Sequence, residues 1–257
     1  MGNAVSLPKR PTGDVSQTHK KVLFFLFIEL IGQYFTSHLS LPWDEALRLH
    51  KEYYTNYGLA IKGLVSHHQI DPLEYNRKVD DALPLEDIIK PNEELKQLLR
   101  DIDRSRVRLW LFTNAYITHG QRIVRLLEVE DQFDGITYCD YSKQPIVCKP
   151  HEEMFAKAMR EAGINRATDC YFVGALTQPR PLDPYFDFPS LDNYSHVFTD
   201  DSYGNCKAAK DHGWTAVHLV EDGVSPPQTP ASQFQITNLE ELRSIFPDFF
   251  KNGIFKA

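Results

Sequence analysis

The stretch KVLFFLFIE, residues 21–29, decides how the chain is interpreted. It follows a polar lead-in and consists almost entirely of apolar and aromatic residues between Lys21 and Glu29. Strands of a parallel sheet are buried on both faces, so they appear in a sequence as short continuous apolar runs. The stretch therefore predicts a first, buried strand. Open α/β proteins carry their chemistry at the C-terminal ends of such strands, yet here that end is apolar, with Leu26, Phe27 and Ile28.

The rest of the chain alternates between strand and helix patterns. Strands are expected at 107–112, 136–138, 170–173 and 215–220, with amphipathic helices between them. Such alternation is typical of an α/β fold with a Rossmann-like parallel sheet and right-handed crossovers. The segment between the first two strands has only helical patterns, which predicts a compact helical block inserted after the first strand. The expected organisation is a disordered lead-in at 1–19, a core of 20–39 and 91–257, the helical block at 40–90, which the family resemblance described below identifies as a cap, and an irregular Pro-rich insertion at 174–199 within the core.

Composition narrows the classes of partner and compartment. A net charge of -7 argues against a protein that binds a nucleic-acid backbone. The four cysteines form no C-x-x-C pair, so a zinc knuckle is not expected and a reduced, cytoplasmic location is favoured, with the nucleus left open. The first apolar run is too short for stable membrane insertion, which needs about 20 residues. Met1-Gly2 and Ser6 match an N-myristoylation pattern, for which a disordered tail is the favoured alternative.

Polar groups follow the ends of three expected core elements. Thr113 and Asn114 follow the second strand, Lys149 precedes a helix, and Asp200-Asp201 precede the last helix of the core. The carboxyl ends of parallel strands meet at one crevice. A threonine hydroxyl and a lysine near a helix N-terminus suit phosphate, and paired carboxylates suit Mg²⁺. Each motif alone also fits a turn, a solvated lysine or a helix cap. Their order together favours a phosphate site.

With these motifs the chain resembles the haloacid dehalogenase-like hydrolases, and among them the fungal pyrimidine 5′-nucleotidase branch. The resemblance covers roughly residues 21–245 and rests on the segments YYxxYGLAIxGL (53–64), EYNRxVDD (74–81), LFTNA (111–115), TYCDY (137–141), VCKPH (147–151) and DDS (200–202). It implies a Rossmann-like core under a helical cap, a Mg²⁺ cofactor, and hydrolysis of a nucleoside monophosphate such as UMP or CMP through an aspartyl-phosphate.

Carried over by position, the resemblance assigns phosphate binding to Thr113 and Asn114, and stabilisation of the transferring phosphoryl group to Lys149. It assigns Mg²⁺ to Asp200 and Asp201. The family's first motif, D-x-D-x-T, should supply the nucleophile and the general acid. Leu26 and Ile28 stand at the positions of those two aspartates, and neither side chain can attack phosphorus or donate a proton.

A second departure separates the fourth strand from the Asp200-Asp201-Ser202 motif by the insertion at 174–199. The two departures together suggest misplaced exon boundaries, and the alternative is a diverged paralogue. The expected function is a pyrimidine 5′-nucleotidase-like phosphatase that is catalytically impaired as written. The alternative is a regulatory protein that binds nucleotide or phosphate without hydrolysing it. In both cases the partner is a small nucleoside monophosphate, and the sequence sets no oligomeric state.

Overall fold

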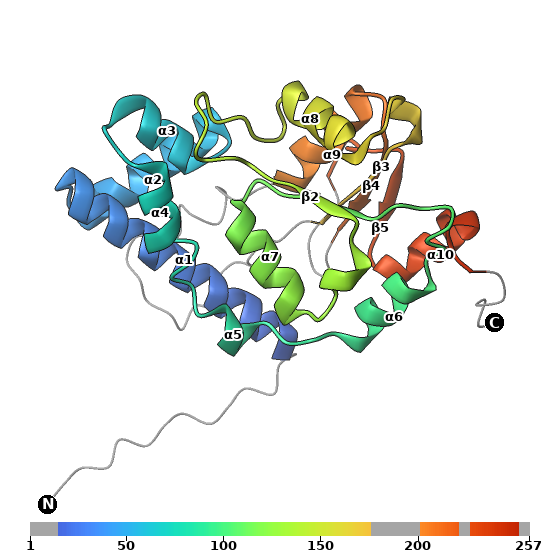
Figure 1. The fold of residues 1–257 in the computed structure, drawn as a ribbon. Helices are drawn as coiled ribbons and strands as arrows, with labels where there is room; N and C mark the ends of the chain where they lie inside the picture. The colour runs from blue at the N-terminus through green and yellow to red at the C-terminus, as the bar shows by residue number, and fades with distance from the viewer. Residues whose placement is uncertain (1–14, 176–200, 221–226, 252–257) are drawn as a thin grey trace, which may run out of the picture.

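The computed structural model describes residues 15–175, 201–220 and 227–251 (Figure 1). Its strands form two parallel sheets. The first pairs β1 (Trp110–Phe112) with β2 (Gly135–Thr137), and the second has the order β3 (Tyr171–Ala175), β4 (Thr215–Leu219), β5 (Phe234–Ile236). All three described pairings are parallel. The predicted α/β class with a parallel sheet is confirmed.

The stretch predicted as the first strand is helical. Helix α1 (Val15–Leu39) contains all of residues 21–29 and also the last residues of the lead-in expected at 1–19. A continuous apolar run does not by itself distinguish a buried strand from a buried helix. Here Ile28, Ile31 and Phe35 lie at helical spacing, and each is at most 5% exposed. The prediction of a first strand at residues 21–29 is therefore wrong. The helical block at 40–90 follows a helix, α1, and not a strand.

Residues 40–90 form short helices that pack against α1 (Figure 1). They are α2 (Trp43–Tyr57), α3 (Ala60–His67), α4 (Pro72–Lys78) and α5 (Leu85–Ile88). Gly58 ends α2 with a left-handed φ of 76°, which glycine adopts without strain. Asp71 caps α4 by accepting a hydrogen bond from the backbone N–H of Leu73.

The α/β part runs from α6 to α10. Its helices are α6 (Glu93–Asp101), α7 (Ile117–Leu126), α8 (Glu152–Ala162), α9 (Asp201–Asp211) and α10 (Leu242–Ile245). Short 3-10 turns lie at Glu130–Gln132, Ala167–Asp169, Leu239–Glu241 and Pro247–Phe249. β1 begins three residues later than expected. β5 has no counterpart among the predicted strands, because its three residues include only one buried side chain, Ile236. Most of the predicted insertion at 174–199 lies outside the described residues.

Aromatic side chains join the two sheets in one core. The ring of Phe112 on β1 lies 5.3 Å from that of Phe155 on α8, 6.1 Å from Phe172 on β3 and 6.0 Å from Trp214 before β4. These distances are typical of packed aromatic pairs. The end of β1 therefore faces the second sheet through apolar side chains.

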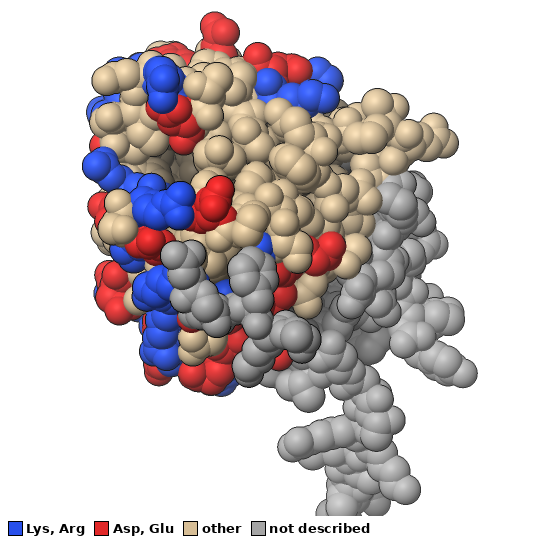
Figure 2. Space-filling model, turned by 90° about the vertical axis from the view of Figure 1, so that its right-hand side faces the viewer, with Lys and Arg blue, Asp and Glu red and all other residues tan. Residues whose placement is uncertain are grey.

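The surface shows no long stripe of one charge on the face drawn in Figure 2. Basic and acidic side chains alternate along one side of this face, and a broad area has few charged residues. Nucleic-acid backbones are bound by continuous basic surfaces, and none is visible in the described part of this face. Among the described helices, none is long and apolar enough to cross a bilayer.

Candidate active site

Asn114 and Lys149, which are far apart in the sequence, hold each other at the end of β1. The side-chain amide of Asn114 donates to the carbonyl of Lys149 at 3.0 Å and accepts from its N–H at 2.8 Å. Each residue is 8% exposed. A buried amide that satisfies both backbone groups of one residue fixes that residue in place. The structure thus brings together two of the residues predicted for phosphate.

The Lys149 ammonium lies at the carboxyl end of β1. Its Nζ donates to the carbonyl of Phe112 at 2.8 Å and lies 4.7 Å from the centre of the Phe112 ring and 5.4 Å from that of Phe172. Aromatic faces attract a cation and exclude water from it. The lysine charge is therefore shielded from water on the side of these two rings, and attraction for an anion is stronger at such a site than at an exposed one.

Thr113 begins the loop between β1 and α7. Its N–H donates to the carbonyl of Thr137, and its hydroxyl oxygen accepts from the N–H of Ala115, both at 3.0 Å. Tyr116 caps α7 without a side-chain hydrogen bond to the helix. The first N–H groups of a helix carry partial positive charge and suit an anion.

Tyr141 supports this loop and was not predicted as a site residue. Its hydroxyl donates to the carbonyl of Asn114 at 3.2 Å, and its ring stacks on Tyr116 at 5.5 Å. Burial, and then the charge of Asp80, raises the pKa of Tyr141 well above its usual range, so the hydroxyl stays protonated as a donor. Its signal was its place in the segment TYCDY, but the contact itself depends on tertiary packing.

The turn between α2 and α3 lies against the Lys149 loop. A Cβ on Gly58 would lie 3.7 Å from the carbonyl oxygen of Lys149 and 3.9 Å from Sγ of Cys148. The helical block therefore contacts the loop that carries the lysine. Gly58 serves this turn through its left-handed φ.

The remaining predicted site residues are not brought to Lys149 by the described contacts. Leu26 and Ile28 lie on α1, which packs on α2, α4 and α5. Asp200 lies outside the described residues. Asp201 is the first residue of α9, and only its backbone is among the described parts of the chain. Within the described residues no three His, Cys, Asp or Glu side chains converge as metal ligands. Mg²⁺ bound by Asp200 and Asp201 therefore stays a prediction.

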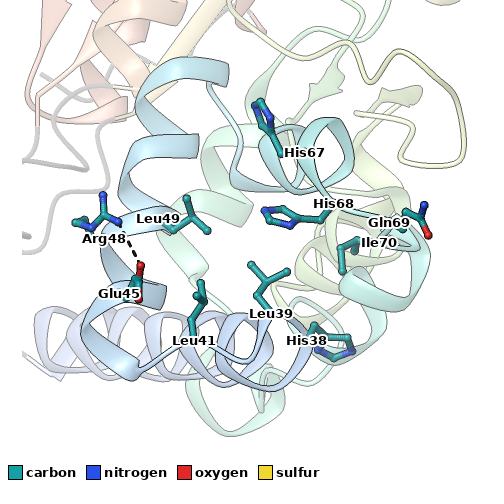
Figure 3. Close-up of a pocket in the computed structure, with 10 residues that line it drawn as sticks. All are labelled: His38, Leu39, Leu41, Glu45, Arg48, Leu49, His67, His68, Gln69 and Ile70. Atoms are coloured by element: carbon teal, nitrogen blue, oxygen red, sulfur yellow. Dashed lines mark ion pairs between the residues drawn. The ribbon is translucent and has the colours of Figure 1, made fainter.

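A pocket of about 580 Å³ lies elsewhere, where the end of α1 meets α2 and the end of α3 (Figure 3). Leu39, Leu41, Leu49 and His68 point toward a common space, and Arg48 pairs with Glu45 at its rim. None of the predicted site residues lines this pocket. It is therefore separate from the loop that carries Thr113, Asn114 and Lys149.

Comparisons with known proteins agree with this fold. The sequence profile of the haloacid dehalogenase-like hydrolases matches residues 20–175. "Phosphate metabolism protein 8" of Saccharomyces cerevisiae is 32% identical over an alignment of 242 residues. The alignment covers 85% of this chain and 66% of that protein, so the chain spans slightly less than two thirds of this relative. A crystal structure of a HAD phosphatase from Thermococcus onnurineus superposes with a TM-score of 0.51 at 17% identity, covering 88% of this chain and 91% of that one. The chain belongs to the haloacid dehalogenase-like hydrolase family.

Proposed function

We propose that this chain binds the phosphate group of nucleoside monophosphates, with UMP and CMP as the first candidates, and hydrolyses them very slowly. The observation that carries the proposal is the mutual fixing of Asn114 and Lys149, which holds a buried ammonium at the end of β1 beside Thr113. A phosphate dianion at this place would meet a lysine charge, a threonine hydroxyl and the N-terminus of α7.

The substrate class rests on the resemblance to pyrimidine 5′-nucleotidases. The name of the yeast relative, a phosphate metabolism protein, is compatible with a phosphorylated ligand. The helical block contacts the Lys149 loop through Gly58. This contact supports a nucleoside site between the helical block and the proposed phosphate site.

The slow turnover follows from the residues at the expected nucleophile positions. Leu26 and Ile28 lack an ionisable group, and both lie on α1. Loss of the nucleophile from a covalent mechanism lowers the rate by several orders of magnitude, about 10⁶-fold in a well-studied hydrolase. Binding does not require the nucleophile, so affinity for the phosphate group is retained. Mg²⁺, when bound, would neutralise phosphate charge.

Two assays on the purified chain test the proposal. Calorimetric titration with UMP, CMP and inorganic phosphate, each with and without Mg²⁺, should detect binding. In the same buffers phosphate release should stay below about 0.01 s⁻¹, against the ~1–1000 s⁻¹ of ordinary enzymes. Release at ordinary rates would refute the impaired turnover. Absence of binding to all three ligands would refute the phosphate site. Binding without measurable release would favour the non-catalytic alternative.

A further inference from the structure

A polar cluster joins the segment after α4 to the first two turns of α7. Its centre is Asp81, whose carboxylate accepts from the amide of Asn76 at 2.9 Å and from the hydroxyl of Thr118 at 2.9 Å. Thr118 is the second residue of α7, and Asn76 is only 2% exposed. We call Asn76, Asp81, Glu86, Thr118 and Arg122 the α4–α7 clamp.

Arg122 closes the clamp one turn further along α7. Its guanidinium donates to the carbonyl of Asp81 at 3.0 Å and to that of Leu83 at 2.7 Å. It also pairs with Glu86 on α5, with its Nε 2.7 Å from Oε1. This pairing holds the pKa of the Glu86 carboxyl at about 2. Three backbone or carboxylate acceptors on one guanidinium define one orientation of α7 relative to residues 81–86.

The clamp is connected to the phosphate loop through the start of α7. Only Ala115 and Tyr116 separate Asn114 from this helix, and Tyr116 supplies no side-chain cap. The carboxylate of Asp81, which is not part of α7, accepts a hydrogen bond from Thr118 in the first turn of α7. The helix dipole favours a negative charge at this end of the helix. A shift of this turn would move the Thr113–Ala115 hydrogen bond and the Tyr116–Tyr141 stack together.

We propose that Asp81 and Thr118 are positioning residues that hold the Thr113–Asn114 loop in its phosphate-binding geometry, with Arg122 fixing the helix behind it. This inference rests on the proposed function, because it assigns a role toward the same phosphate site. It also makes the turn after α4, which carries Asp81, part of that site's support. Neither residue touches the ligand in this account.

The substitutions Asp81→Asn and Thr118→Val test the inference. Asn at position 81 removes the negative charge beside the first turn of α7 and one of the two acceptor oxygens, and Val at 118 removes the hydroxyl. Each should weaken UMP binding by about tenfold or more, and Thr118→Ser should restore it to within about twofold. The control is Arg243→Ala, which breaks another ion pair between elements, at 2.8 Å to the 7% exposed side chain of Asp101. It should lower the melting temperature and leave UMP affinity within about twofold.

Hydrogen exchange gives a second measurement that does not depend on a ligand. Peptides covering residues 113–118 should exchange faster in Asp81→Asn and Thr118→Val than in the parent chain. Their exchange rate in Arg243→Ala should equal that of the parent chain. If the parent binds UMP while both clamp variants bind it equally well, the positioning role is overturned and the proposed function stands. If the parent binds neither UMP nor phosphate, the proposed function and the positioning role are both refuted. If exchange at 113–118 is unchanged in the clamp variants, the positioning role is also overturned.

Discussion

Asp80 is the buried carboxyl with a raised pKa at the junction of the helical block and the core. It is 5% exposed and precedes Asp81 of the α4–α7 clamp. Burial, and then the charge of Asp81, raises its pKa to about 7. The folded state therefore favours the protonated acid. Below pH 4 this group contributes no penalty. As pH rises from 4 to 7, Asp80 ionises in the unfolded chain while it stays protonated in the folded chain, so the free energy of unfolding decreases.

Replacing Asp80 by Asn should stabilise the protein at pH 8 and leave its stability nearly unchanged near pH 4. A shift of about three pH units sets an upper bound of about 4 kcal/mol on the gain. Urea unfolding of both proteins at pH 4.5 and pH 8 measures this difference. Burial lowers the pKa of His50 to about 4, so His50 decreases the free energy of unfolding as pH falls. Both proteins contain His50, so this contribution cancels in the difference between them. An equal effect of Asp80→Asn at the two pH values would contradict the account.

At the scale of elements, strand patterns with flanking turns were predictable and the first apolar run was not. The stretches expected at 170–173 and 215–220 correspond to β3 and β4, because each is a short run rich in β-branched or aromatic residues. Residues 21–29 lack such a boundary, since apolar residues continue at helical spacing to Phe35. β5 is too short and too exposed to give a pattern.

The helical assignment of α1 predicts that aspartates at its expected nucleophile positions give no enzyme. Ile28 is 5% exposed, so Leu26→Asp/Ile28→Asp places a carboxylate at a buried position, which costs more than about 2 kcal/mol. The double variant should unfold at lower urea and release no more phosphate from UMP than the parent. The exposed Glu29→Gln serves as a control and should change stability by less than about 0.5 kcal/mol. A stable double variant with clear turnover would mean that this segment ends at the site.

Two helical glycines, one packed between α2 and α3 and one without close neighbours in α9, predict opposite effects of substitution by alanine. A Cβ on Gly63 would lie 2.2 Å from Cγ of Tyr53, whereas a Cβ on Gly204 in α9 has no neighbour within 4 Å. Gly63→Ala should therefore destabilise the fold by about 1–3 kcal/mol. Gly204→Ala should stabilise it by up to about 1 kcal/mol through helix propensity. Thermal unfolding monitored by circular dichroism measures the melting temperatures of the two variants. A higher melting temperature for Gly63→Ala than for Gly204→Ala would contradict this packing.

At the scale of the whole molecule, the sequence allowed the prediction that Thr113, Asn114 and Lys149 lie near one edge, because ends of parallel strands share that edge. The structure places Asn114 directly on Lys149. The supporting contacts of Tyr141 and Gly58 could not be predicted, since they depend on how distant elements pack. Asp200 and Asp201 remain predicted metal ligands, because their side chains are outside the described residues.

Calorimetric titration of UMP into Lys149→Met and Lys157→Met tests whether the Lys149 ammonium binds the phosphate group. Lys157 is a matched control, because its Nζ also donates to a backbone carbonyl, that of Tyr138 at 2.6 Å, and lies 4.7 Å from an aromatic ring centre. A charge-assisted hydrogen bond to phosphate contributes about 1.5–3 kcal/mol, so Lys149→Met should weaken UMP binding by about tenfold or more. Lys157→Met should bind UMP like the parent chain. Equal affinities of the parent and Lys149→Met would contradict the account.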